Sequence, residues 1–458
     1  MKITKCDIRG VYKEDIDEEL AFHLGQSTLI YTFRKMHRES GIKVVVAGDV
    51  RPSTVSLKNS LIEGMSSIGG EIIDIGIVPT PAFNFANKYF NANLGIMITA
   101  SHNPPEYNGF KININGKSTS EQELNDIVKI FKTKSYRVGK RKGKIEEINI
   151  LNIYIENLLS KINYKGNLKV VIDAGNGNQS TLAPFIFEKY GHKVIKLYCE
   201  PDGNFPNRLP NPAIKDNLIN LSKKVKDTQS NLGIAFDGDG DRIGFVNNKG
   251  LYVENDKIIS LFAKYFLKEQ PNEKIVYDIK CSNIVAETIE QNKGIGIVEK
   301  SGHSYIRLRM MNEKAIFGGE LSGHYFFKIL DGEDDSLFAG LLLCKIIQES
   351  KKSLAELEAE IPSYFTTPDI RIPFDIEKAN EILNSIPSRF KDFSLITIDG
   401  FKILFPHGWA LIRISSTEPI LTLRFEADDR YKLKEIINTV STKIPEIKDS
   451  IFDNVSLS

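Results

Sequence analysis

The sequence has little of what marks a secreted, membrane-spanning or polyanion-binding protein. Its 458 residues include four cysteines, scattered and without a CxxC pair, which argues against a disulfide framework or a zinc site. No stretch of eighteen apolar residues occurs, and Met1 to Gly10 contain no apolar signal-peptide core. The net charge is +1, from 60 basic and 59 acidic residues, without the basic surplus of phosphate-backbone binders. These absences predict a cytoplasmic protein with no membrane or nucleic-acid partner, and they leave the oligomeric state undetermined.

What is present indicates a globular chain of several domains. The apolar fraction is 41% and the charged fraction 26%, and the length exceeds what one hydrophobic core usually supports. Short runs rich in Val and Ile close on Gly-, Asp- or Pro-containing turns: Ile42–Asp49, Leu94–Ala100, Leu168–Ala174, Leu232–Asp237, Lys274–Asp278 and Ala315–Gly319. Amphipathic stretches with helical spacing, such as Asp216–Lys226 and Asp256–Lys268, lie between several of them. The alternation predicts mixed or parallel sheets in three related α/β domains.

The pattern changes after Pro362–Pro373. The segments Phe401–Phe405 and Trp409–Ile414 flank a turn at Pro406–Gly408 and predict a hairpin, to which Leu421–Ala427 adds a third strand. Tyr431–Ile444 predicts a closing helix, so the last module is expected to be a small α+β domain. The expected domains are 1–148, 149–250, 251–365 and 366–458.

A basic segment lies near the first expected boundary. Eight Lys and Arg residues crowd Lys129–Lys144, but no aromatic platform accompanies them. A solvated interdomain segment within Thr133–Ile150 is therefore a better interpretation than a nucleic-acid patch.

Ser101 is the first candidate for chemistry. It lies in Thr99-Ala100-Ser101-His102-Asn103-Pro104-Pro105, directly after an apolar run, and Lys111 follows in Tyr107–Lys111. Such a serine is a covalent nucleophile or only part of a capped turn, and the segment alone favours neither. No GxSxG nucleophile elbow surrounds it.

Alternating carboxylates form the second candidate. Asp237, Asp239 and Asp241 alternate with glycines after an apolar run, and Arg242 follows. Like charges this close need a cation, and oxygen ligands suit Mg²⁺. An EF-hand loop needs Gly at its sixth position and Glu at its twelfth. This sequence has Arg242 and Asn248 there, so an EF-hand is excluded. A purely structural acidic turn is the weaker alternative, and Arg242 is suited to hold phosphate.

Two further loops carry polar side chains. Gly318–His324 offers Glu320, Ser322 and His324 for sugar hydroxyls, although glycine-rich strand ends are often simple turns. Arg413-Ile414-Ser415-Ser416-Thr417-Glu418-Pro419 has the composition of a phosphate cradle or, alternatively, of a polar hairpin loop.

In this order the four segments resemble the α-D-phosphohexomutase superfamily, over nearly the whole chain. Cys6–Gly10 is similar to that family's YDIRG opening, and Asp278–Ser282 and Ser301–Ser304 are similar to two further substrate-contacting loops. The N-terminus and the Gly319–His324 loop most resemble bacterial and archaeal phosphomannomutase/phosphoglucomutase. The resemblance implies four domains around a central cleft, and transfer of a phosphoryl group between the 1- and 6-positions of a hexose through a bound 1,6-bisphosphate.

The resemblance also implies roles for individual residues. Ser101 would be the phosphoserine and would share Mg²⁺ with Asp237, Asp239 and Asp241. Lys111, near Arg9, and His303 would be candidate acid/base groups. The remaining substrate contacts would come from His102, Arg242, Lys280, Glu320, Ser322, His324, Arg413, Ser415, Ser416 and Thr417.

The sequence departs from the family pattern at two places, and rival functions follow from the same scaffold. Cys6 stands where close relatives commonly have Tyr, and Ser416 stands where Gly or Asn is common. The nearest rival is a phosphoglucosamine mutase. A non-catalytic sugar-phosphate-binding phosphoprotein and a metal-dependent phosphatase are less favoured, because every reactive position and a second phosphate cradle are present. Residue types do not rank mannose against glucose.

Overall fold

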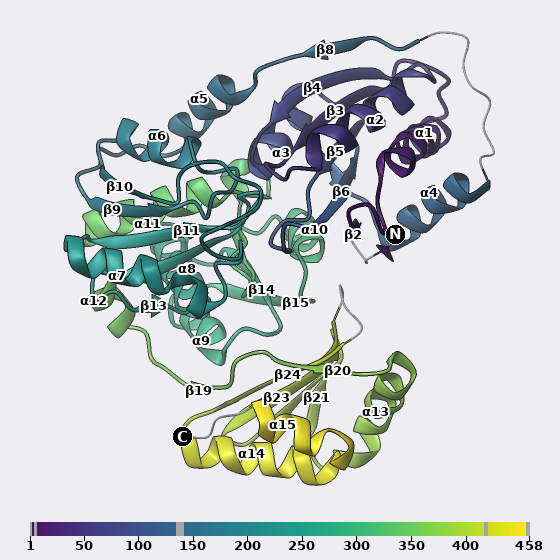
Figure 1. Ribbon diagram of the computed structural model, residues 1–458. Coiled ribbons are helices and arrows are strands. Elements are labelled where there is room, and N and C mark those ends of the chain that lie inside the picture. Colours follow the sequence, from purple (N-terminus) through teal and green to yellow (C-terminus); the bar gives the residue numbers. More distant parts are fainter. Residues whose placement is uncertain (1, 4–6, 134–141, 416–419, 455–458) are drawn as a thin grey trace. The chain divides into compact units, whose positions relative to one another are not determined.

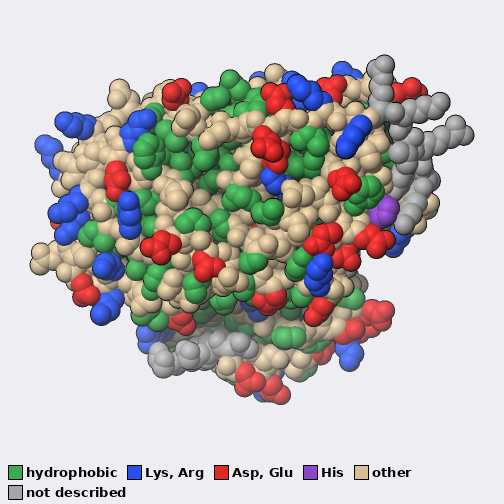
Figure 2. All heavy atoms as spheres, turned by 45° about the horizontal axis from the view of Figure 1, so that its top comes forward, with side chains coloured by type: hydrophobic (Ala, Val, Ile, Leu, Met, Phe, Trp, Pro, Cys, Tyr) green, Lys and Arg blue, Asp and Glu red, His purple; other side chains and the backbone are tan. Residues whose placement is uncertain are grey.

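The computed structural model describes residues 2–3, 7–133, 142–415 and 420–454 of the chain (Figure 1). These residues form two compact units. The first contains Met1–Glu254, Ser322–Tyr325 and Glu333–Leu357, and the second contains Asn255–Leu321, Phe326–Gly332 and Glu358–Ser458. Among the described residues, no helix is both long and apolar enough to cross a membrane. On the face shown in Figure 2, acidic and basic side chains are interspersed, in keeping with the near-zero net charge.

The N-terminal sheet, in the first unit, is mixed and has the order β1-β2-β6-β5-β3-β4-β8, with β7 paired to β6. Its strands are β1 (Lys2–Ile3), β2 (Ile8–Val11), β3 (Lys43–Gly48), β4 (Glu71–Ile77), β5 (Leu94–Ile98), β6 (Tyr107–Ile114), β7 (Lys117–Ser118) and β8 (Ile145–Glu147). Its helices are α1 (Glu18–Lys35), α2 (Thr54–Ser66), α3 (Thr80–Tyr89) and α4 (Glu121–Thr133). Strand β3 runs parallel to β4 and β5, whereas β5 and β2 are antiparallel to β6.

The second sheet, also in the first unit, has the order β10-β9-β11-β12-β13, and α5 (Leu151–Lys161) precedes it. Its elements are β9 (Lys169–Asp173), α6 (Leu182–Lys189), β10 (Lys193–Leu197), η1 (Lys215–Leu218), α7 (Ile219–Thr228), β11 (Leu232–Phe236), β12 (Ile243–Asn247) and β13 (Tyr252–Val253). Strands β10, β9 and β11 are parallel, and β12 is antiparallel to β11.

In the second unit, β14 lies between the parallel strands β15 and β16. The elements of this part are α8 (Asn255–Glu269), β14 (Lys274–Asp278), α9 (Asn283–Gln291), β15 (Ile295–Glu299), α10 (His303–Glu313) and β16 (Phe317–Gly319). The chain continues through β17 (Tyr325–Phe327) and η2 (Lys328–Leu330). It then returns to the first unit with β18 (Glu333–Asp334) and α11 (Ser336–Ser350), and α12 (Leu354–Ala359) contains the boundary between the units.

The C-terminal sheet is antiparallel, with the order β19-β24-β23-β22-β21 and β20 paired to β24. Its elements are β19 (Phe365–Thr366), β20 (Ile370–Pro373), α13 (Ile376–Arg389), β21 (Ser394–Ile396), β22 (Phe401–Phe405), β23 (Gly408–Ile414), β24 (Ile420–Ala427), α14 (Arg430–Lys443), η3 (Pro445–Ile447) and α15 (Lys448–Asn454). The hairpin, third strand and closing helix expected after Pro373 are therefore present.

Each of the six apolar runs contains a strand, and Asp256–Lys268 lies within α8. Two details differ from expectation. The helix expected over Asp216–Lys226 begins as the 3₁₀ turn η1 before α7. The segment expected to be only solvated and interdomain contains β8, which pairs with β4 at the sheet edge. Because all three β8 residues are exposed, no hydrophobic alternation marks the strand.

Two glycines allow α1 and α2 to approach closely. A Cβ on Gly25 would lie 2.5 Å from the Leu61 carbonyl oxygen, and one on Gly64 would lie 2.1 Å from the Phe22 carbonyl oxygen. The two helices share one buried core with β3 and β5. Their spacing therefore depends on the absence of side chains at these two positions.

We predict that Gly64→Ala destabilises the first unit by about 1–3 kcal/mol, because the overpacking cost exceeds the gain in helix propensity. In thermal unfolding, Tm should fall by about 2–10 °C. Asn59→Ala, at an exposed position of the same helix, is the matched control and should change Tm little. An unchanged Tm in Gly64→Ala would show that the helices separate without cost.

Candidate active site

Ser101 lies on a strained turn directly after β5. It is 1% exposed and has φ +52°, in the left-handed region that non-glycine residues rarely adopt. Its backbone N–H donates to Thr99 Oγ1 at 2.8 Å, and Thr99 Oγ1 donates to Asp49 Oδ2 at 2.7 Å. These bonds hold the serine in a conformation that costs about 1–3 kcal/mol on its own.

Arg51 fastens the same turn and was not anticipated from the sequence. Its guanidinium is fully buried and donates through Nε to Asp49 Oδ2 at 3.0 Å. Its terminal nitrogens donate to four backbone carbonyls, those of Ser101, Asn103, Pro104 and Tyr107, at 2.5–2.9 Å. The only sequence signal was a charged pair, Asp49 and Arg51, directly after an apolar run.

The serine hydroxyl points at the acidic loop that follows β11. Ser101 Oγ donates to Asp237 Oδ2 at 3.0 Å. Asp237 Oδ1 accepts the backbone N–H groups of Gly240, Asp241 and Arg242 at 2.9–3.1 Å. Burial, and then the neighbouring carboxylates of Asp239 and Asp241, raise the pKa of Asp237 well above its usual range.

The three carboxylates form one buried group that could hold a metal ion. One oxygen from each of Asp237, Asp239 and Asp241 lies within 4.8 Å of the others. Among the residues that the structure describes, Asp239 Oδ1 and Asp241 Oδ1 are buried without a hydrogen-bond partner. Three clustered carboxylates, two of them with an orphaned oxygen, suit a hard cation such as Mg²⁺.

Lys111, on β6, neutralises part of this charge. Its Nζ lies 2.7 Å from both Asp239 Oδ2 and Asp241 Oδ2. Burial acts to lower the pKa of Lys111, but the two carboxylates raise it well above its usual range. In turn, burial would raise the pKa of Asp241, and Lys111 holds it below its usual range. Thr80, also missed in the sequence, donates to Asp239 Oδ2 at 2.7 Å.

Arg9 and His102 also lie beside the serine turn. Arg9 Nε donates to Asp7 Oδ2 at 2.8 Å, and Arg9 Nη1 donates to Asn103 Oδ1 at 2.6 Å. His102 Nδ1 lies 3.4 Å from Ser101 Oγ. Burial, and then the positive charges of Arg242 and Arg9, lower the pKa of His102 well below its usual range, so this imidazole is neutral near pH 7.

Arg242 is oriented by a histidine and a carboxylate of the same unit. Its Nε donates to His324 Nε2 at 2.9 Å, and His324 Nδ1 lies 2.7 Å from Asp334 Oδ2. Because Nε2 accepts, the His324 proton is assigned to Nδ1 and donated to Asp334. Asp334 was not anticipated, since only the fold brings it to His324. Ser322 Oγ, in the same segment, is buried without a partner among the described residues.

In the second unit, the loop after β14 carries Lys280. Its backbone is held by charged side chains of other elements: Lys402 donates to the carbonyls of Ile279 and Cys281, Arg424 donates to that of Lys280, and Asp256 accepts the Ser282 N–H. Burial lowers the pKa of Lys402 to about 8. The Lys280 ammonium lies 3.7 Å from Asp369 Oδ2 and 4.0 Å from Asp278 Oδ2.

The other predicted residues of this unit have more varied surroundings. His303 begins α10 and its ring lies 5.3 Å from the Phe326 ring. Glu320 is 7% exposed, and its Oε2 has no partner among the described residues. Arg413, on β23, donates through Nε to Asp399 Oδ2 at 2.7 Å. The Ser415 backbone N–H donates to the Ile420 carbonyl at 2.9 Å. Cys6, Ser416 and Thr417 lie outside the described residues.

Within the first unit the structure thus brings together Ser101, Asp237, Asp239, Asp241, Lys111, Arg9, His102, Arg242 and His324. Lys280, His303, Glu320, Arg413 and Ser415 belong to the second unit.

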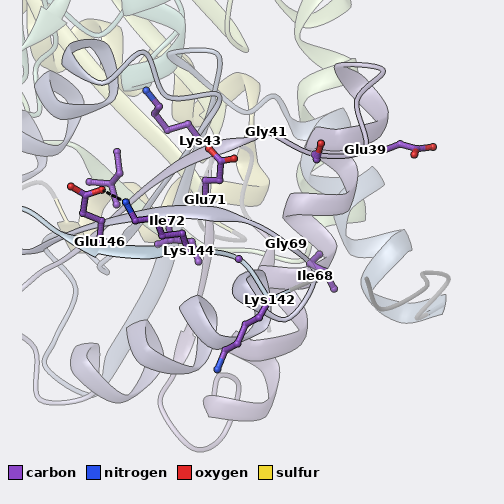
Figure 3. Close-up of a pocket in the computed structure, with 13 residues that line it drawn as sticks. Glu39, Gly41, Lys43, Ile68, Gly69, Glu71, Ile72, Lys142, Lys144 and Glu146 are labelled. Atoms are coloured by element: carbon purple, nitrogen blue, oxygen red, sulfur yellow. Dashed lines mark hydrogen bonds and ion pairs between the residues drawn. The ribbon is translucent and has the colours of Figure 1, made fainter. Parts of the chain in front are cut away.

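A separate hollow of about 920 Å³ in the first unit is lined by none of these residues, and Figure 3 shows the side chains that line it. Its lining includes Lys43 and Glu71, where β3 and β4 begin, and the ion pair between Lys144 and Glu146 at 3.2 Å. The hollow therefore lies at the amino ends of these strands, whereas Ser101 follows the carboxyl end of β5 in the same sheet. Because ligands of open α/β sheets bind outside the carboxyl ends of the strands, this hollow is not the candidate active site.

We predict that Lys111→Met leaves the buried carboxylates without their ammonium partner and lowers stability by about 3 kcal/mol at pH 7 in the presence of chelator. The contribution of Lys111 requires ionised carboxylates whose pKa is lowered in the folded state. It is therefore fully present at neutral pH and disappears as the pH falls below about 4. Thermal unfolding of the wild type and of Lys111→Met, measured from pH 7 to below pH 4, gives the difference in stability.

Lys117→Met, at an exposed lysine of neighbouring β7, is the control and should show no such pH-dependent difference. Equal stability of Lys111→Met and the wild type at pH 7 would contradict the assigned ion pairs.

Comparisons with known proteins agree with this architecture. The chain matches the phosphoglucomutase/phosphomannomutase family through its alpha/beta/alpha domains I, II and III, over residues 1–138, 152–250 and 254–365, and its C-terminal domain, over 366–443. A phosphomannomutase/phosphoglucomutase of Pseudomonas putida is 35% identical, over 97% of this chain and 96% of the relative. A probable phosphoglucosamine mutase of Pyrococcus horikoshii is 34% identical, over 98% of each chain.

A crystal structure of a phosphoglucomutase/phosphomannomutase family protein from Burkholderia thailandensis superimposes with a TM-score of 0.89, at 31% identity and 97% coverage of each chain. Three α/β domains followed by a domain with an antiparallel sheet are the four-domain architecture of these enzymes. The chain belongs to the phosphoglucomutase/phosphomannomutase family, within the α-D-phosphohexomutase superfamily.

Proposed function

We propose that the chain is an intramolecular phosphotransferase that interconverts the 1- and 6-phosphates of glucose and mannose. A phosphoryl group carried on Ser101 passes to the free position of the hexose phosphate and gives a 1,6-bisphosphate. The bisphosphate turns round and returns its other phosphoryl group to Ser101. The observation that carries the proposal is the Ser101 hydroxyl, 3.0 Å from the first of three buried carboxylates.

Each transfer exchanges one phosphorus–oxygen bond for another. The bond to Ser101 Oγ breaks while a bond to the hexose hydroxyl forms, and the hydroxyl proton passes to a base. Lys111 is held protonated by Asp239 and Asp241, so in this state it can donate a proton or stabilise negative charge but cannot accept a proton. Arg9 also stays charged, because a guanidinium does not lose its proton in proteins. We propose His303 as a further acid/base candidate.

The donor set supports a Mg²⁺ site formed by Asp237, Asp239, Asp241 and the Ser101 side chain. The ion would neutralise charge on the transferring phosphoryl group. The chain supplies the rest of the charge compensation: Lys111 bridges two of the carboxylates, and Arg242 is fixed beside them by His324. Phosphoryl transfer depends mainly on such alignment and charge stabilisation.

The remaining predicted residues are proposed to grip the substrate away from the reacting bond. Arg413, with Ser415, Ser416 and Thr417, would hold the phosphate that is not being transferred. Lys280 and His102 would contact phosphate or sugar oxygens. The orphaned oxygens of Glu320 and Ser322 are available for sugar hydroxyls, because a buried polar atom without a partner favours a ligand that supplies one.

The cytoplasmic location stays a prediction.

The substrate assignment rests on relatives and has a specific alternative. A Pseudomonas putida relative is named phosphomannomutase/phosphoglucomutase, whereas the Pyrococcus horikoshii relative is named probable phosphoglucosamine mutase, at nearly the same identity. Leu321 in the Gly319–His324 loop favours the first, because glucosamine-specific enzymes usually carry Gln there.

The test compares kcat/KM for glucose, mannose and glucosamine 1-phosphates in coupled assays, with the wild type and with Ser101→Ala. Activity on glucose and mannose 1-phosphates should exceed that on glucosamine 1-phosphate. Ser101→Ala should lose at least about a thousandfold in rate, because the covalent step disappears. Ser180→Ala, at a buried serine of the same unit, is the control and should keep its turnover.

A preference for glucosamine 1-phosphate would correct the substrate but leave the reaction class. Full activity in Ser101→Ala would contradict the phosphoserine mechanism.

A further inference from the structure

We propose that Asp399 is a positioning residue that orients the Arg413 guanidinium for the phosphate of the substrate. The inference rests on the proposed function, because it takes Arg413 as a phosphate-binding residue. Asp399 lies in the turn between β21 and β22, outside every segment that the sequence pointed to for chemistry.

The contact uses one particular nitrogen of the arginine. Arg413 Nε donates to Asp399 Oδ2 at 2.7 Å, and the two side chains are only 6% and 14% exposed. A guanidinium is planar, so a bond at Nε fixes the plane in which both terminal nitrogens lie. Phosphate recognition by arginine uses those nitrogens as a fork, and its strength depends on their direction.

The turn that carries Asp399 is itself fixed against Arg413. Gly400 has φ +69°, and a Cβ at this position would lie 2.3 Å from the Ile412 carbonyl oxygen and 2.7 Å from Arg413 Cβ. Only glycine allows both this backbone conformation and this close approach. Asp399 is therefore held beside the arginine by its neighbour's backbone as well as by its own carboxylate.

The same carboxylate oxygen reaches a second loop. Asp399 Oδ2 accepts the Ser301 backbone N–H at 3.3 Å, and Ser301 Oγ donates to Asp278 Oδ1 at 2.6 Å. Asp278 Oδ1 also accepts the Lys280 N–H at 2.9 Å. One hydrogen-bonded path thus runs from Arg413 through Asp399, Ser301 and Asp278 to the loop of Lys280, and Asp399 is the member that contacts Arg413. Removing Asp399 should misdirect Arg413 without removing any group that contacts phosphate.

A merely structural ion pair would give a different result from a positioning residue. A structural pair would lower Tm and leave the binding of ligand to the remaining folded protein unchanged. A positioning residue should weaken phosphate binding in protein that is fully folded, and only while Arg413 is present.

The experiment measures KM and kcat for glucose 1-phosphate, together with calorimetric binding of glucose 1-phosphate, in the full-length chain. Asp399→Ala should raise KM and the dissociation constant about tenfold, with a smaller effect on kcat, because the supporting group acts on binding. Asp399→Asn keeps an acceptor for Nε and nearly the same shape, so it should show a smaller loss and keeps the test valid if the alanine variant folds poorly.

A double-mutant cycle shows whether the effect passes through Arg413. In an Arg413→Ala background, Asp399→Ala should change the dissociation constant by less than about twofold. Asp428→Ala is the matched control, because Asp428, directly after β24, pairs with His407 in the turn between β22 and β23, and both side chains are 53% exposed. It should leave binding unchanged.

Binding within twofold of wild type in both Asp399 variants, or an equal effect of Asp399→Ala with and without Arg413, would overturn the inference. Either result in an enzyme that still turns over leaves the proposed function intact. A wild-type chain without mutase activity, or one in which Arg413→Ala binds glucose 1-phosphate normally, would instead contradict the proposed function, and this inference with it.

Discussion

Three aspartates buried within 4.8 Å of one another impose the main electrostatic constraint on the first unit. Such a group is stable only if positive charge and hydrogen-bond donors surround it. Lys111 supplies an ammonium to two of the carboxylates, and backbone N–H groups and the Ser101 hydroxyl serve the third. The same arrangement that compensates the carboxylates in the folded protein therefore aims a serine hydroxyl at them.

A dense set of hydrogen bonds holds the serine turn in place. Ser101 adopts a left-handed backbone conformation inside the protein, where the buried Arg51 guanidinium ties four carbonyls of the turn together. A phosphoryl carrier that must give and receive its group in both directions benefits from a fixed oxygen position, because alignment is most of the catalysis in such transfers. The strain at Ser101 is offset by these hydrogen bonds.

The sequence predicted the strand-rich segments and the change of architecture after Pro373, because each has a local pattern. That the serine, lysine and carboxylate segments belong to one site was implied by the family resemblance and not by any local pattern. Local patterns missed β8, whose three residues are exposed and show no alternation. They also missed Arg51, Asp334 and Asp399. Each is a single charged residue whose partner lies elsewhere, such as Asp334 beside His324, and only the fold defines the pair. Supporting residues of this kind cannot be recognised from their spacing in the sequence, whereas alternating carboxylates and glycine-rich loops can.

The most direct test of the central claim follows the phosphoryl group itself. The purified chain is incubated with glucose 1,6-bisphosphate carrying a labelled phosphorus and separated from free ligand. One portion is digested and mapped, and the other portion, still intact, is chased with unlabelled glucose 1-phosphate. The account predicts label on Ser101 alone, at no more than one group per chain, and its transfer into bisphosphate during the chase. Label on another residue, or label on Ser101 that the chase does not remove, would contradict the account.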